Sequence, residues 1–319
     1  MNRDSKAGQP PSGGIVEQLL KGEPHALARA ITVVENDLDG ASAILTAIQP
    51  HLGRASIIGV TGPPGVGKST LINVLIAELR SRGRRVGLLA VDPSSSLTGG
   101  AILGDRIRMA SHANDQGVFI RSLASRGHLG GLFRTALGVV QVMDAAGPDF
   151  LIIETVGVGQ SDMEIASVAQ TQIVVCAPGL GDDIQAIKAG VLEIADFLVV
   201  NKSDMELAGD TVRQLESMLR LRDPILGTAS ILATTATTGA GIPALADELE
   251  AVRNAGIART PDPTRRIRQI LANTVTDVLR GYLEAGTDPN IELLCERVKR
   301  GEIGFDGAAR ILLKDLIRY

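Results

Sequence analysis

The chain has 319 residues, of which 45% are hydrophobic and 21% charged, as expected for a globular protein with one sizeable α/β domain and attached helical segments. A net charge of −4 and an aromatic content of 2% argue against nucleic-acid binding, which needs clustered positive charge and stacking rings. No apolar run approaches the roughly 20 residues that span a bilayer. The two cysteines, Cys176 and Cys295, lack disulfide-framework or zinc-site spacing, which favours a cytoplasmic location.

The apolar pattern divides the chain into three parts. Residues 1–52 contain a polar tail and a helical extension, residues 53–257 alternate short apolar strands with helices, and residues 258–319 form a helical arm after a linker at 261–266. We expect strands at 55–60, 85–91, 118–122, 150–153, 172–176, 197–200 and 231–234. Short strands that are apolar on both faces predict an α/β fold with a mostly parallel central sheet flanked by helices.

A glycine-rich loop follows the first of these strands and precedes a helix expected from residue 69 to about 82. Its sequence, GPPGVGKS at 62–69, fits the GxxxxGK[ST] pattern of a phosphate-binding P-loop, and the strand and helix give this pattern its required context. Lys68 would bridge phosphate oxygens and the Ser69 hydroxyl would bind Mg²⁺. The loop predicts nucleotide binding by Gly62, Pro63, Pro64, Gly65, Val66, Gly67, Lys68, Ser69 and Thr70.

The strand at 150–153 leads into Glu154, at a position where P-loop enzymes hold magnesium either directly or through water. Gly157 would donate its N–H to the γ-phosphate, in a loop that senses this phosphate. Val158 stands where Ras-like enzymes have a glutamine that orients water, and Gln160 is an open substitute. We therefore expect slow intrinsic hydrolysis that a partner stimulates.

A second loop, NKSD at 201–204, follows the strand at 197–200 and fits the guanine-reading pattern NKxD. Asp204 would accept hydrogen bonds from two guanine donors that adenine lacks, so that ATP would leave a carboxylate unpaired. Lys202 would lie over the base, and Asn201 would tie the two loops together. The segment Thr235, Ala236 and Thr237 occupies the place where a backbone contact to the guanine oxygen is expected. The sequence therefore predicts a GTP hydrolase.

Four longer segments make the chain resemble one family of such enzymes. They are VDPSSS at 91–96, TGGAILGDR at 98–106, ETVGVGQ at 154–160 and PGLGDDIQAIKAGVLEIAD at 178–196. With them the chain, from about residue 15 to its end, is similar to the MeaB/MMAA/ArgK-type GTPases. These are G-protein chaperones of adenosylcobalamin-dependent acyl-CoA mutases, chiefly methylmalonyl-CoA mutase. One departure is the threonine-rich guanine loop at 235–237, where relatives commonly have a Ser-Ala pair.

The resemblance implies further site residues and partners. Asp92 and Asp105 would lie near magnesium and the γ-phosphate and orient water or hold the metal; taken alone, each is also consistent with a capping or solvated aspartate. The loop at 179–188, with Asp182, Asp183 and Lys188, would be a switch facing the mutase, although its composition alone indicates a solvated acidic loop. The helical arm would form a homodimer, whereas its apolar stripes are equally consistent with packing on residues 53–257, the P-loop G domain.

Three functions remain to be compared. The favoured one is a GTPase that gates adenosylcobalamin loading and protects or reactivates the mutase. A P-loop kinase associated with transport would need an acceptor pocket, and a metal-insertion GTPase would need a His- or Cys-rich site, whereas the four histidines are scattered. The chain has no DxHxxG motif, so we expect magnesium with GTP or GDP as its ligands and no cobalamin site of its own.

Overall fold

A computed structural model describes most of the chain. The described residues are 12–92, 110–112, 114–124, 132–155, 168–179, 195–222, 229–256, 263–285 and 288–317. Within them, no helix combines the length and the apolar character that crossing a membrane would need.

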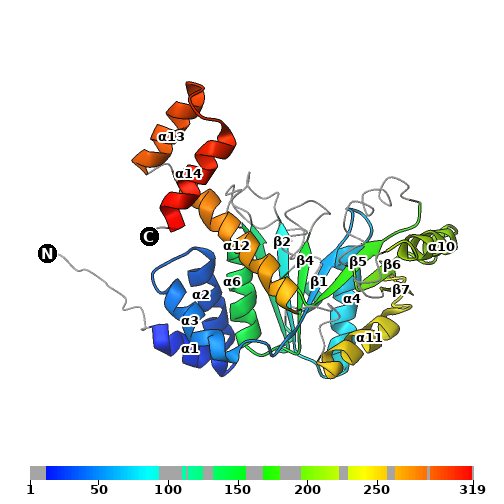
Figure 1. The fold of residues 1–319 in the computed structure, drawn as a ribbon. Coiled ribbons are helices and arrows are strands. Elements are labelled where there is room, and N and C mark those ends of the chain that lie inside the picture. Colours follow the sequence, from blue (N-terminus) through cyan, green and yellow to red (C-terminus); the bar gives the residue numbers. More distant parts are fainter. Residues whose placement is uncertain are drawn as a thin grey trace.

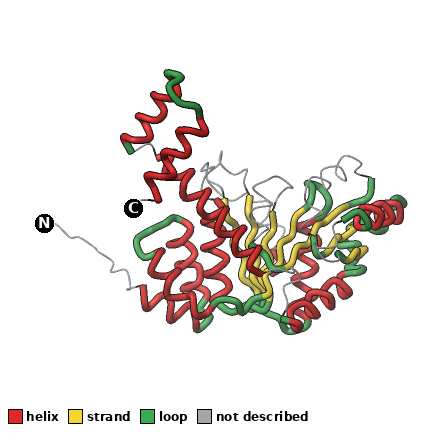
Figure 2. The backbone as a smooth tube through the Cα atoms, viewed as in Figure 1, coloured by secondary structure: helices red, strands yellow, loops and turns green. Residues whose placement is uncertain are grey.

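A seven-stranded parallel sheet forms the centre of the molecule (Figures 1 and 2), and its strand order is β3-β2-β4-β1-β5-β6-β7. All seven strands predicted from the apolar runs begin and end within two residues of the observed bounds. The strands are β1 (Ser56–Thr61), β2 (Val86–Asp92), β3 (Val118–Ala124), β4 (Phe150–Thr155), β5 (Thr171–Cys176), β6 (Phe197–Val200) and β7 (Ser230–Ala233).

The sheet is covered on both faces because successive strand residues point to opposite sides. In β4, Phe150 and Ile152 join a core with α4 (Lys68–Ser81) and α11 (Ile242–Ala255). Leu151 and Ile153 instead join the core that includes α6 (Leu132–Ala145). A smaller cluster packs β5 and β6 against α10 (Ala208–Leu219). All of these strand residues are buried, which explains their continuous apolar runs.

The N-terminal extension is a set of helices packed on α6. These are α1 (Ser12–Leu20), α2 (Pro24–Glu35) and α3 (Ala41–Ile48), followed by the short 3₁₀ helix η1 (Gln49–His51). Their buried apolar residues are continuous with the α6 side of the main core. A second short 3₁₀ helix, η3 (Ala110–His112), precedes β3.

The C-terminal arm consists of α12 (Pro263–Ala285), α13 (Pro289–Lys299) and α14 (Phe305–Ile317). Helix α12 crosses α6, whereas α13 and α14 pair with each other away from the sheet (Figure 1). The Asp277 carboxylate, 7% exposed, accepts a hydrogen bond of 3.1 Å from the backbone N–H of Arg134 in the first turn of α6. The expected linker at 261–266 is wrong from Pro263 onward, because this residue begins α12. The fixed φ of proline suits the first turn of a helix.

Candidate nucleotide-binding site

The P-loop lies where β1 gives way to α4, as the sequence predicts. Gly62 has φ of 149°, Gly65 of 81° and Gly67 of 92°, which are values that side-chain-bearing residues rarely adopt. A Cβ atom on Gly62 would lie 2.2 Å from the Val175 carbonyl oxygen of the neighbouring strand β5. The loop therefore needs glycine at 62 both for its backbone angle and for its close approach to the sheet.

Lys68 is the first residue of α4 and its side chain lies back over the loop. The Lys68 Nζ donates to the Gly62 carbonyl oxygen at 2.7 Å and to the Pro63 carbonyl oxygen at 2.9 Å. The side chain is buried although it carries a charge, and burying a charge is costly unless it is hydrogen-bonded. The structure thus holds an ammonium group against the loop that is predicted to receive phosphates.

Ser69 and Glu154 meet beside this loop although 85 residues separate them in the sequence. The Ser69 hydroxyl donates to Glu154 Oε1 at 2.6 Å, and the Glu154 residue is only 5% exposed. Glu154 reaches this place because β4 pairs in parallel with β1, with Glu154 opposite Val60. Two oxygen-bearing side chains predicted to hold magnesium are therefore adjacent.

Asn201 connects the second loop to the first. Its side-chain Nδ2 donates to the Val66 carbonyl oxygen at 2.9 Å, and its Oδ1 accepts from the Ala236 N–H at 3.1 Å and from the Thr234 hydroxyl at 3.2 Å. The residue is 2% exposed. A Cβ atom on Gly67 would lie 2.5 Å from Asn201 Nδ2, so the two loops are in close contact. This one amide joins three segments of the chain.

The other residues of the second loop extend the same connection. Lys202 has a positive φ of 56°, and its Nζ donates to the Gly65 carbonyl oxygen at 2.8 Å. The Ser203 and Thr235 hydroxyl oxygens are 2.9 Å apart, and the Ser203 N–H donates to the Thr234 carbonyl oxygen. Asp204 is exposed at the outer end of the loop. The structure thus gathers the segments at 62–69, 201–204 and 234–236 at one end of the sheet.

Most of the remaining predicted site residues lie partly or wholly outside the described residues. Asp92 ends β2, where its backbone pairs with Ala124, and its side chain is not described. The others that fall outside are Asp105, Gly157, Asp182, Asp183 and Lys188. Thr237 is described and exposed, next to the buried Thr235 and Ala236.

Sequence reasoning missed two contacts around the loops. The Thr155 hydroxyl donates to the Thr61 hydroxyl at 3.1 Å between two buried strand ends. The Thr234 hydroxyl bonds Asn201 at the end of β7, as described above. Thr61 and Thr155 end β1 and β4, and Thr234 directly follows β7, so all three lie at the carboxyl edge of the sheet; polar residues after an apolar run are the signal that could have found them.

A phosphate loop that is joined by direct hydrogen bonds to an Asn-Lys-Ser-Asp loop, on a parallel sheet covered by helices, defines the class of P-loop GTPases. Comparison with known proteins narrows this class. Residues 27–286 match the family model described as methylmalonyl Co-A mutase-associated GTPase MeaB, and the chain belongs to that family. It is accordingly a GTP hydrolase.

Three known proteins are similar to this chain over most or all of its length. A putative GTPase of Pyrococcus abyssi is 43% identical over 95% of this chain and 96% of its own length. The mouse protein named methylmalonic aciduria type A homolog, mitochondrial, is 32% identical over 93% of this chain and 77% of its own length. A crystal structure titled LAO/AO transport system kinase superposes with a TM-score of 0.66 at 26% identity, with both chains covered completely.

Proposed function

We propose that this GTPase is a chaperone of an adenosylcobalamin-dependent mutase, chiefly methylmalonyl-CoA mutase, and that it gates cofactor loading and protects or reactivates that enzyme. The observation that carries the proposal is the match of residues 27–286 to a family described as mutase-associated. The similarity to the mouse methylmalonic aciduria type A homolog supports the same client. If GTP and GDP bind two conformations of the complex with different affinities, the bound nucleotide would decide which conformation the complex adopts.

The P-loop residues 62–70 would bind the phosphates of GTP. Lys68 would turn its ammonium group from the loop carbonyls toward the β- and γ-phosphate oxygens, which offer it more negative charge. At the base, Asp204 would accept from guanine, Lys202 would cover the ring, and the backbone of 235–237 would contact the guanine oxygen. Asn201 would keep these two halves of the site at a fixed distance.

Magnesium fits the residues beside the loop. Because the Ser69 hydroxyl donates a hydrogen bond to Glu154, the lone pairs of its oxygen are available to a cation. A carboxylate with a hydroxyl is an oxygen donor set of the kind that Mg²⁺ prefers. When bound, the ion would neutralise charge on the β- and γ-phosphates. Ser69 would be a direct ligand, Glu154 would act directly or through a water, and Asp92 and Asp105 are the further candidates.

The hydrolytic step would depend on a partner. Val158 stands in place of a water-orienting glutamine, so Asp92, Asp105, Gln160 and the Gly157 N–H are the candidates to act on the attacking water and the γ-phosphate. The loop at 179–188, with Asp182, Asp183 and Lys188, is proposed as the switch that contacts the mutase. Charge reversal at Lys188 should then leave GTP affinity unchanged and remove stimulation by the mutase.

The test measures complex formation and turnover together. The chain is mixed with adenosylcobalamin-dependent methylmalonyl-CoA mutase in the presence of GDP or of a non-hydrolysable GTP analogue, and co-elution and phosphate release are recorded. We expect a complex whose amount depends on the nucleotide, and phosphate release that the mutase accelerates. Equal behaviour with both nucleotides and no acceleration would contradict the proposal.

A kinase is the second candidate, because the solved neighbour described above carries that title. The same assay separates the two functions. A hydrolase releases the γ-phosphate of radiolabelled GTP as inorganic phosphate, whereas a kinase transfers the label to an acceptor molecule.

A homodimer through the C-terminal arm is also proposed. Four apolar residues of α12 follow one another at helical spacing and remain about half exposed, namely Ile267 (58%), Leu271 (58%), Val275 (55%) and Val278 (48%). Ile270 on the same helix instead packs against the main core. Helix α12 thus has one side on the G domain and an exposed apolar side that a second copy could cover.

A further inference from the structure

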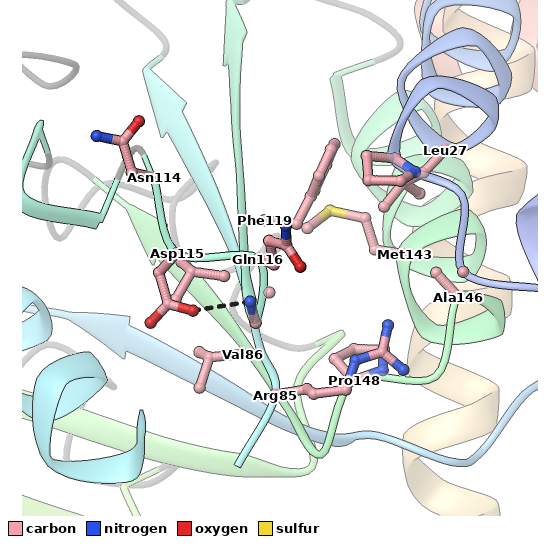
Figure 3. Close-up of a pocket in the computed structure, with 15 residues that line it drawn as sticks. Leu27, Arg85, Val86, Asn114, Asp115, Gln116, Phe119, Met143, Ala146 and Pro148 are labelled. Atoms are coloured by element: carbon pink, nitrogen blue, oxygen red, sulfur yellow. Dashed lines mark hydrogen bonds between the residues drawn. The ribbon is translucent and has the colours of Figure 1, made fainter. Parts of the chain in front are cut away.

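A cavity lies at the N-terminal ends of two strands, and Figure 3 shows the residues that line it. Its volume is about 240 Å³, and Val86, Val118 and Phe119 line it at the N-terminal ends of β2 and β3. The nucleotide loops follow the C-terminal ends of β1 and β6. Because strands rise about 3.3 Å per residue, the seven-residue strand β2 puts roughly 20 Å between the two ends of the sheet. The cavity is therefore separate from the nucleotide site.

Most of the cavity wall is apolar, and its polar edge is formed by Asn114, Asp115 and Gln116, with the Asp115 carboxylate paired to the Arg80 guanidinium. Leu27 contributes from the N-terminal helices, and Met143 and Pro148 contribute from the end of α6 and the turn into β4 (Figure 3). At about 30 Å³ per water molecule, the space equals roughly eight waters. The apolar part of the wall holds ordered water poorly, so a short hydrocarbon chain is the better occupant of that part.

Cationic side chains border this cavity. A neighbouring polar hollow of about 410 Å³ shares Arg85 and Pro148 with it and adds Lys21, Arg54 and Arg253. Figure 3 shows Arg85 beside Pro148 at the cavity. Lys21 is paired with Glu17 at 2.7 Å and Arg253 with Asp149 at 2.6 Å, so Arg85 and Arg54 supply the positive charge beside the apolar space.

Two of these cations have donors to offer a ligand. Asp149, in the same hollow, is already engaged, because it accepts from the Arg253 guanidinium at 2.6 Å and from the Arg85 backbone N–H at 2.8 Å. The Arg85 guanidinium reaches the Gly147 carbonyl oxygen at 3.4 Å, and Arg54 Nη2 lies 3.4 Å from His51 Nδ1. Within the part of the chain that the structure describes, neither guanidinium pairs with a carboxylate.

We propose that this region is a binding site for an amphipathic anion, with its apolar chain in the cavity and its carboxylate or phosphate on Arg85. A guanidinium presents paired N–H donors that match either head group. The ligand would contact the N-terminal helices, the sheet and the turn after α6 at once. Its binding would therefore stabilise the packing of the N-terminal extension on the G domain.

The test uses octanoate and octyl phosphate as probes, with octanol, octylammonium and butanoate as comparisons. Binding to the full chain is followed by the amide NMR shifts of Gly22 and Gly117, which line the cavity. We expect at least one anionic octyl probe to bind and butanoate to bind at least about tenfold more weakly, because it buries four fewer methylene groups. Octanol and octylammonium should bind more weakly than that probe, and the better anion identifies the head group.

Arg85→Gln and Arg84→Gln are matched variants. The Arg84 guanidinium pairs with Glu250 at 3.0 Å and does not line the cavity. We expect Arg85→Gln to weaken anion binding about tenfold, as loss of a charge-assisted hydrogen bond predicts, and Arg84→Gln to leave it unchanged. Unaltered melting temperature and GTP affinity control for the fold.

Three results would overturn the proposal. They are the absence of shifts at Gly22 and Gly117 with both anions, octylammonium binding as tightly as the anions, and equal weakening by the two arginine variants. The first two are measured on the unmodified chain, so they decide the matter even if Arg85→Gln fails to fold.

Discussion

Asn201 is the residue on which the two nucleotide loops depend. Its amide bonds to Val66, Thr234 and Ala236 inside a buried site. Asn201→Ala would leave a buried carbonyl and a buried N–H without this partner, and each such group costs about 1–3 kcal/mol. We expect the free energy of unfolding to fall by about 3 kcal/mol and GTP affinity to fall with it, as measured by urea denaturation and nucleotide titration.

Ser203→Ala is the matched control for this prediction. Its hydroxyl makes one partly buried hydrogen bond, to Thr235, so the loss should be about 1 kcal/mol. Equal losses for the two variants would show that Asn201 is not the main connection between the loops.

Asp115 makes the free energy of unfolding depend on pH in the acid range. The Arg80 guanidinium donates to both of its carboxylate oxygens at 2.8 Å, and this pair, with the Gly117 N–H, lowers the pKa of Asp115 below its ordinary 3.8. Such a group stabilises the fold fully above the unfolded pKa and loses that contribution as the pH falls through the folded pKa. Denaturation of wild type and Asp115→Asn should therefore show a stability difference at pH 7 that shrinks near pH 3. A difference of the same size at both pH values would contradict this.

Among the elements, the entry into β1 is held by a buried carboxylate of α6. Asp144, 4% exposed, accepts the backbone N–H groups of Gly53, Arg54 and Ala55 at 2.5, 3.1 and 2.8 Å. Asp144→Ala should lower the free energy of unfolding by about 3 kcal/mol, because three amides lose a charged acceptor. Asp144→Asn should cost less, because one oxygen already accepts two of the three bonds. Urea denaturation measures both, and equal losses would contradict this role.

The sequence predicts a helix or strand well where its apolar residues are continuously buried. It predicts poorly the contacts between segments that are distant in the sequence. Each strand is predictable because it is a short apolar run, and each of the two loops because its motif follows such a run. The hydrogen bond from Asn201 to Val66 was an expected connection, but its geometry depends on parallel pairing of β1, β5 and β6, which no local pattern specifies. The contact of Asp277 with α6 had no local signal, since an aspartate among apolar helix residues is typical of a solvated position.

For the whole molecule, the exposed stripe of α12 predicts the oligomeric state. Leu271→Glu combined with Val275→Glu would place charges in an apolar contact between copies, so light scattering should report a dimer for wild type and a monomer for the variant. GTP affinity should be unchanged, because neither Leu271 nor Val275 is among the predicted nucleotide-binding residues. A wild-type mass equal to that of one chain would refute the dimer.

The most direct test of the central claim, that this chain is a guanine-selective GTPase, is the nucleotide preference of Asp204→Asn. Xanthine carries a carbonyl group where guanine carries the exocyclic amino group, so an asparagine amide suits xanthine and a carboxylate suits guanine. Hydrolysis by wild type and variant is compared with GTP, ATP and XTP. We predict GTP preference for wild type, and for the variant a fall of at least about 100-fold in kcat/KM for GTP with a gain for XTP. An unchanged preference for GTP in the variant, or equal use of ATP by wild type, would contradict the account.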